Sequence, residues 1–193
     1  SLVHGVFDKV ASRYDLMNDL MSGGLHRVWK RVLMNRLNPR PGMALVDIAG
    51  GTGDVAARFL QRAGEAATAI ICDLNVNMLA LSRDRLLDAG VVDGISLVCC
   101  NAESLALADR GADACTISFG LRNVTRRAPA LEEAWRVLKP GGHFLCLEFS
   151  PAVLPLLAPL YAAYSDKILP ALGGLVTGDR EAYQYLVDSI RRF

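Results

Sequence analysis

The fold is decided by one stretch, Val46-Asp47-Ile48-Ala49-Gly50-Gly51-Thr52-Gly53-Asp54. The apolar residues up to Ile48 predict a buried strand, and the pattern from Asp54 onward predicts a helix. Residues 49–53, the glycine loop, join the two. Glycines allow a tight turn in which the backbone approaches a ligand closely, with the N–H groups of the helix start pointing at it. In an open α/β sheet such a loop lies at the carboxyl edge, where ligands bind.

The residues after the glycine loop predict the rest of an α/β domain. Strands are expected at 44–48, 68–72, 95–100, 114–119 and 144–149, and helices at 54–63, 76–89 and 128–138. Strands that are apolar on both faces and joined by helices are typical of a parallel sheet covered on both sides. Short connections and right-handed crossovers then predict a Rossmann-like, doubly wound, mostly parallel sheet.

The flanking segments are predicted to be helical, within a single domain overall. Residues 1–40 should form an amino-terminal lid, residues 41–150 the cofactor-binding core, and residues 151–193 a carboxy-terminal substrate or lid segment with helices near 154–169 and 179–192. The amino-terminal segment has apolar residues at helical spacing, namely Leu16, Leu20, Val28, Trp29, Val32 and Leu33.

The composition excludes several classes of protein. With 193 residues, 52% hydrophobic and 21% charged, the chain is globular. A net charge of +1 gives no reason to expect nucleic-acid binding. The five cysteines lack metal-ligand spacing, so we expect buried thiols and no metal site. Without a signal sequence or a membrane span, the expected location is cytoplasmic.

Polar residues after the second and third predicted strands point to a nucleoside cofactor. Asp73 follows Gly53 by twenty residues, where a carboxylate can accept hydrogen bonds from two ribose hydroxyls. Ala56 stands where the dinucleotide fingerprint tolerates alanine, so an NAD(P)-linked oxidoreductase stays open. Asp47 favours S-adenosylmethionine, because a carboxylate suits an ammonium group and repels a pyrophosphate. Asn101-Ala102 suits an adenine edge.

Two further motifs carry a resemblance to a known family. The stretches Phe7-Asp8-Lys9-Val10-Ala11-Ser12-Arg13-Tyr14-Asp15-Leu16-Met17-Asn18-Asp19 and Ser118-Phe119-Gly120-Leu121-Arg122-Asn123-Val124 resemble the two signatures of the ubiquinone/menaquinone biosynthesis C-methyltransferase family. Arg136-Val137-Leu138-Lys139-Pro140-Gly141-Gly142 is similar to a motif of many class I methyltransferases. The chain stops before the antiparallel strand pair that completes the family's sheet, so the sequence predicts a sheet without that pair.

The resemblance implies a reaction and a cofactor. Family members transfer a methyl group from S-adenosylmethionine to a ring carbon of a prenylated benzoquinol or naphthoquinol and release S-adenosylhomocysteine. The resemblance implies that the cofactor is contacted by Thr52, Asp73, Asn101, Ala102 and Ser118. Gly51 and Asp47 join this set from their place in the glycine-loop motif. A different small-molecule methyltransferase and a non-catalytic, methyltransferase-like subunit remain the alternatives.

The acceptor must lose a proton before its ring carbon becomes nucleophilic, because phenols have a pKa of about 10. Arg122 is predicted to stabilise the phenolate or to orient a water that takes the proton, and Asn123 to hold a quinol oxygen. The alternative for Arg122 is a helix cap or a pair with a surface carboxylate. Tyr14 is predicted to contact the sulfonium or the quinol.

The prenyl tail of such a substrate implies contact with a membrane. Residues 151–176 are apolar but interrupted by prolines and charges, which indicates an interfacial segment and not a span. We therefore expect a peripheral position on the inner membrane, on the matrix side if the protein is mitochondrial. A homodimer or a quinone-biosynthesis complex are the assemblies that the resemblance leaves open.

Overall fold

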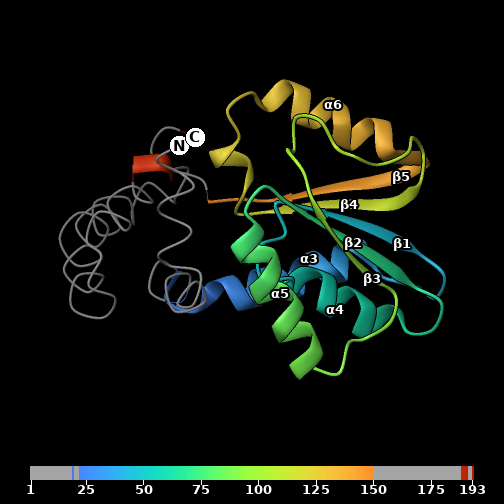
Figure 1. Cartoon of the computed structure of the whole chain (residues 1–193). Helices are drawn as coiled ribbons and strands as arrows, with labels where there is room; N and C mark the ends of the chain where they lie inside the picture. The colour runs from blue at the N-terminus through green and yellow to red at the C-terminus, as the bar shows by residue number, and fades with distance from the viewer. Residues whose placement is uncertain (1–18, 20–21, 150–187, 191–192) are drawn as a thin grey trace. The chain divides into compact units, whose positions relative to one another are not determined.

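A computed structural model describes residue 19 and residues 22–149, 188–190 and 193. The chain divides into two compact units, residues 1–28 with 149–193, and Trp29–Glu148. The second unit contains the complete sheet shown in Figure 1 and all of the glycine loop. The helix predicted near 154–169 lies outside the described residues. Of the one predicted over 179–192, residues 188–190 are described and are helical.

All strand pairs among the described residues are parallel, which agrees with the predicted mostly parallel sheet. Its strands are β1 (Ala44–Ile48), β2 (Thr68–Asp73), β3 (Ile95–Cys99), β4 (Ala112–Ser118) and β5 (Leu138–Leu147), in the order β3-β2-β1-β4-β5. The chain builds outward from β1 to β3 and then returns to place β4 on the other side of β1 (Figure 1). The strand order therefore reverses between β1 and β4, and the glycine loop follows β1 at this switch point, where ligands bind in doubly wound sheets.

Helices cover both faces of the sheet. They are α3 (Leu25–Leu37), α4 (Asp54–Ala63), α5 (Val76–Asp88) and α6 (Arg127–Val137), and a short 3-10 helix, η2 (Leu121–Asn123), follows β4. Figure 1 shows α6 on one face and α4 and α5 on the other. Leu45 packs with α4 and α5, whereas Val46 and Ile48 pack with α6. Because side chains alternate along a strand, Asp47 shares the face of Leu45.

Two predictions of local structure were wrong. The strand expected to begin at residue 144 begins at Leu138, because Ala112 pairs with Leu138 and Ala114 already with His143, so four residues of β5 bulge out of the ladder. Pro140-Gly141-Gly142 lies in this bulge, although its residue types predict a loop. Of the five thiols expected to be buried, Cys99 and Cys146 are exposed. They lie on β3 and β5, the edge strands of the described sheet.

The helix α3 buries an unexpected face. Leu33, Met34 and Leu37 are buried as an apolar stripe, but Val32 is 49% exposed while Lys30 is only 4% exposed. Lys30 precedes Leu33 by three residues and Met34 by four, so all three lie on one side of the helix. In the part of the chain that the structure describes, no helix is both long and apolar enough to cross a bilayer.

Candidate active site

The glycine loop is held by its own backbone and by its neighbours. The Gly50 N–H donates to the Cys72 carbonyl at 3.1 Å, and the Gly53 N–H donates to the Gly50 carbonyl at 3.0 Å. Gly53 has a φ of +76°, and a Cβ there would overlap the Ser82 hydroxyl. The packing of α5 against the loop therefore requires glycine at this position, for both conformational and steric reasons.

Gly53→Ala is expected to lower the free energy of unfolding by about 1–3 kcal/mol, because the variant combines a strained φ with overlap. Urea unfolding measures this change. Gly90→Ala is the matched control, since Gly90 has a φ of +73° and nothing within 4 Å of an added Cβ. The double variant Gly53→Ala/Ser82→Ala should recover part of the loss. Equal losses in Gly53→Ala and Gly90→Ala would show that overlap contributes nothing.

Asp73 connects the glycine loop to the next helix. Its Oδ2 accepts the Gly51 N–H at 2.9 Å, and its Oδ1 accepts the Asn75 N–H at 2.9 Å. Asn75, and not Asp73, is the N-cap of α5, because its side chain accepts the N–H groups of Asn77 and Met78. The Asp73 carboxylate is therefore oriented at the end of β2.

Asp47 is a buried carboxyl group with one unsatisfied oxygen. The residue is 1% exposed, and its Oδ1 accepts the Thr116 hydroxyl at 2.7 Å. Its Oδ2 and the Ser118 hydroxyl are buried without a hydrogen-bond partner among the described residues. Burial raises the pKa of Asp47 to about 7, against the opposing effects of Thr116 and Lys30. Since unpaired buried polar atoms are uncommon, these two oxygens are candidate contacts for a ligand.

The loop after β3 is held by hydrogen bonds from side chains of later segments of the chain. Asn101 Oδ1 accepts the Glu103 N–H at 3.0 Å, and Ala102 beside it is half-buried. Glu103 in turn accepts the Arg126 backbone and side chain at 2.9 and 2.7 Å. Arg136 donates to the Leu105 carbonyl at 3.0 Å. These contacts keep the Asn101-Ala102 pair beside the end of β2, where an adenine next to a ribose on Asp73 would lie.

Arg122 lies just past β4, as predicted, but its guanidinium faces inward. It donates to the Phe119 carbonyl at 2.7 Å and pairs with Glu148, whose Oε2 also accepts the Arg122 backbone N–H at 3.1 Å. The side chains of Arg122 and Glu148 are only 1% and 5% exposed. The pairing of Arg122 with a carboxylate therefore follows the alternative from the sequence, except that this carboxylate is buried and not at the surface. Asn123 is half-buried in the same 3-10 helix.

The structure gathers most of the predicted cofactor residues at one edge. Asp47, Gly51, Thr52, Asp73, Asn101, Ala102 and Ser118 all lie at or just beyond the carboxyl ends of four neighbouring strands. Tyr14 lies outside the described residues. Lys30, Thr116 and Glu148 were not predicted as site residues from the sequence. Lys30 sits at helical spacing from the buried Leu33 and Leu37, and Glu148 directly follows a strand, which are signals for these two residues.

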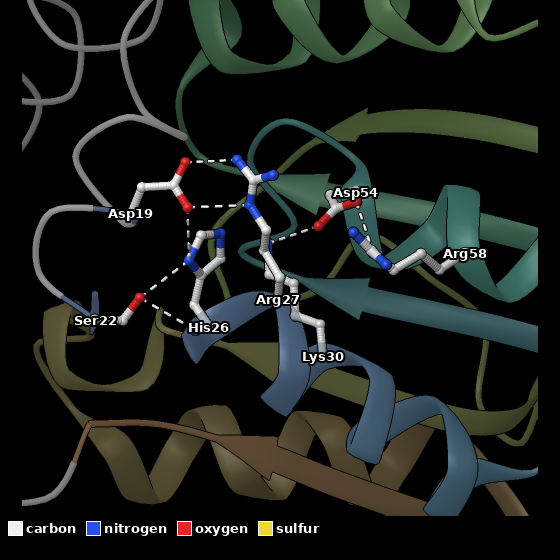
Figure 2. A network of polar contacts seen from close by, with 7 residues as sticks. All are labelled: Asp19, Ser22, His26, Arg27, Lys30, Asp54 and Arg58. Atoms are coloured by element: carbon white, nitrogen blue, oxygen red, sulfur yellow. Dashed lines mark hydrogen bonds and ion pairs between the residues drawn. The ribbon is translucent and has the colours of Figure 1, made fainter. Parts of the chain in front are cut away.

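A serine, a histidine and an aspartate meet near the start of α3 without forming a catalytic relay. Ser22 Oγ and Asp19 Oδ1 both approach Nδ1 of His26, at 3.1 and 3.5 Å (Figure 2). A relay uses the two different ring nitrogens. Ser22 Oγ also accepts the His26 backbone N–H, at 3.1 Å. This cluster therefore closes the first turn of the helix. Across the described ranges, no group of three metal-ligating side chains is found.

Solved structures share the fold at low sequence identity. The [4+2]-cyclase SpnF matches with a TM-score of 0.69 and 16% identity, covering 99% of this chain and 90% of the cyclase. An S-adenosylmethionine-dependent methyltransferase from Aquifex aeolicus matches with a TM-score of 0.59 and 17% identity, covering 79% of this chain and 78% of the Aquifex protein. These likenesses concern the fold alone, because one fold hosts different chemistries.

The fold, together with the predicted cofactor residues at the carboxyl edge of the sheet, defines a class I S-adenosylmethionine-dependent methyltransferase. The model of the ubiE/COQ5 methyltransferase family matches residues 1–193. Curated relatives from Bradyrhizobium diazoefficiens and Nitrobacter hamburgensis, both named ubiquinone/menaquinone biosynthesis C-methyltransferase UbiE, are 54% and 55% identical over all of this chain and 78% of their own lengths. The chain therefore belongs to the ubiE/COQ5 methyltransferase family. This membership confirms S-adenosylmethionine over the NAD(P) that loop spacing left open.

Proposed function

We propose that this chain transfers a methyl group from S-adenosylmethionine to a ring carbon of a prenylated benzoquinol or naphthoquinol, within ubiquinone and menaquinone biosynthesis. The observation that carries the proposal is the identity of 54% across the whole chain with a relative named for this reaction. The arrangement of polar groups at the carboxyl edge of the sheet supports it, because these groups match the parts of the methyl donor.

The residues at the edge fit an amino acid joined to a nucleoside. Asp73 is placed to accept the ribose hydroxyls while it holds the Gly51 N–H, and the Asn101-Ala102 pair adjoins the adenine. The oxygens of Asp47 and Ser118 that lack a partner among the described residues are suited to receive the ammonium group, and Thr52 of the glycine loop is also buried. The cofactor, when bound, supplies a methyl group on a positively charged sulfur. The chain itself supplies orientation and a site with little water.

On the acceptor side, we infer that the segment from Ser118 to Asn123 shapes the methyl-transfer site. The Arg122 guanidinium holds the Phe119 carbonyl and is neutralised by Glu148, so Arg122 acts by fixing this segment and not by direct contact with the phenolate. Of Arg122 and Asn123, it is Asn123 that holds a quinol oxygen. Tyr14 completes the site in the proposal. Since opposite charges cancel during transfer, a water-poor pocket favours the reaction.

A direct assay tests the proposed function. The purified protein is incubated with S-adenosylmethionine and a short-tailed benzoquinol or naphthoquinol kept reduced, and the quinone products are identified by mass spectrometry. A ring-methylated product with equimolar S-adenosylhomocysteine is expected. Calorimetry should show binding of S-adenosylhomocysteine and none of NADH. Cofactor turnover on unrelated phenols, with neither quinol methylated, would indicate another small-molecule methyltransferase instead.

We further infer that the protein works at a membrane surface, as a homodimer or within a quinone-biosynthesis complex. The polyprenyl tail of the proposed acceptor supports this, because such a tail partitions into the bilayer. Flotation with anionic vesicles containing the quinol should carry the protein upward. A protein that stays at the bottom of the gradient, with and without quinol, would contradict the membrane part of the inference. Sedimentation velocity tests the dimer.

A further inference from the structure

Lys30 is a buried cation beside the glycine loop. The residue is 4% exposed, and its Nζ donates to Asp54 Oδ2 at 2.8 Å (Figure 2). Asp54 Oδ1 accepts the Arg58 Nε at 2.8 Å. Lysine is almost never fully buried unless it is paired, so the burial of Lys30 depends on its ion pair with Asp54.

The partner of Lys30 is the first residue of α4, the helix whose N–H groups end the glycine loop. Asp47 and Asp54 bracket this loop in the sequence, and both are held by tertiary contacts, Asp47 by Thr116 and Asp54 by Lys30. Burial alone would raise the pKa of Asp54, but Lys30 and Arg58 keep it below its usual value. The ion pair is therefore formed at neutral pH, and it ties α3 to the loop.

The same lysine also acts on the Asp47 carboxyl. Burial is the largest influence on its pKa and favours the protonated form. The polar groups that act on it come from four elements, namely the Thr116 hydroxyl on β4, Lys30 on α3, Asp54 on α4 and Asp73 at the end of β2. Thr116 and Lys30 favour the carboxylate, whereas the two aspartates favour the protonated form. The Asp47 charge also acts on the thiols of Cys72 and Cys115. Burial is the main cause that raises the pKa of each thiol, and the Asp47 charge raises it further, so both thiols stay protonated.

We propose that Lys30 is a positioning residue of the cofactor site, which holds the start of α4 and favours the carboxylate form of Asp47 for the ammonium group of the ligand. The inference rests on the proposed function, since it assigns Asp47 to the methionine part of the cofactor. It adds a residue on α3, outside every motif of the sequence, to the machinery that binds the methyl donor.

The test is the pH dependence of S-adenosylhomocysteine binding, measured by titration calorimetry on the full chain between about pH 5 and 8. A cationic group prefers ionised Asp47, so affinity is high above the pKa of Asp47 and falls as the pH drops through it. Lys30→Met removes the charge and keeps the stem. In this variant, the pH at which the affinity falls should be higher than in the wild type by about one unit. This is the size expected for the loss of one nearby charge in a partly shielded interior.

A second variant predicts the opposite sign. Asp54→Asn removes a carboxylate that disfavours ionised Asp47, so the pH at which the affinity of this variant falls should be lower than in the wild type. Lys30→Arg keeps the charge and should follow the wild type. Lys139→Met is the matched control, because it removes one lysine from an ion pair with Asp113 at 2.8 Å while Lys139 is 44% exposed. The ligand's own titration is common to all variants and cancels.

The outcomes separate this inference from the proposed function. Weaker binding by the same factor at every pH in Lys30→Met and Asp54→Asn alike would reduce Lys30 to a structural role and overturn the inference. If Lys30→Met does not fold, the downward shift in Asp54→Asn and the wild-type profile of Lys30→Arg decide the question. A wild type that binds no S-adenosylhomocysteine at any pH would overturn the proposed function, and this inference with it.

Discussion

Replacement of Glu148 by alanine is expected to lower the free energy of unfolding by about 3–5 kcal/mol, because it leaves the buried guanidinium of Arg122 without its counter-charge. The pair is closed to solvent, with side-chain exposures of 1% for Arg122 and 5% for Glu148. Glu148 also accepts the Arg122 backbone N–H at 3.1 Å, so this acceptor is lost as well. Urea unfolding followed by circular dichroism measures the change.

Two comparisons show that burial is the cause. The double variant Arg122→Met/Glu148→Leu removes both charges together and should lose much less stability than Glu148→Ala. Asp109→Ala breaks an ion pair with Arg136 in which the aspartate side chain is 70% exposed, and should cost less than about 1 kcal/mol. A loss of that small size in Glu148→Ala would mean that water reaches the Arg122 guanidinium.

Replacement of Asp73 by alanine should weaken S-adenosylhomocysteine binding by about 100-fold or more. The carboxylate is proposed to accept the two ribose hydroxyls, and hydrogen bonds to a charged group contribute about 1.5–3 kcal/mol each. It also orients the glycine loop and the start of α5, through the Gly51 and Asn75 N–H groups at 2.9 Å. Calorimetry at neutral pH measures the affinity.

Asp113 provides the control for Asp73. Its carboxylate also accepts a backbone N–H, that of Ala44 at 2.8 Å, and it lies near the starts of β1 and β4, at the opposite edge of the sheet. Asp113→Ala should therefore leave cofactor affinity unchanged. Equal weakening in both variants would show that the loss reflects general destabilisation. Unchanged affinity in Asp73→Ala would remove the ribose from its proposed place.

Membership of the family does not by itself assign the chemistry to residues. The [4+2]-cyclase SpnF shares this fold over 99% of the chain, so the fold is compatible with more than one reaction. The reaction must therefore be assigned from individual side chains. The predictions for Asp73, Glu148 and Lys30 test these side chains individually.

The arrangement of the sheet was predictable because its signals are local. Apolar runs with a glycine loop at 49–53 and helices between them specify parallel strands, and the observed α4, Asp54–Ala63, begins and ends at the predicted residues. The carboxyl-edge location of Asp73 and Asn101 followed from the same pattern, because parallel strands end at one edge. The start of β5 was not predictable, since its bulge depends on pairing with β4.

The amino-acid sequence by itself determined the class of fold, the edge at which the cofactor residues gather and the family. These depend on periodicity and on motifs whose residues are neighbours in the chain. Only the tertiary structure decided that Arg122 turns inward to Glu148, that Lys30 is buried against Asp54 and that one oxygen of Asp47 has no partner among the described residues. The partners in these contacts are 24 to 69 residues apart, and burial, which sets their charge states, exists only once the chain is packed.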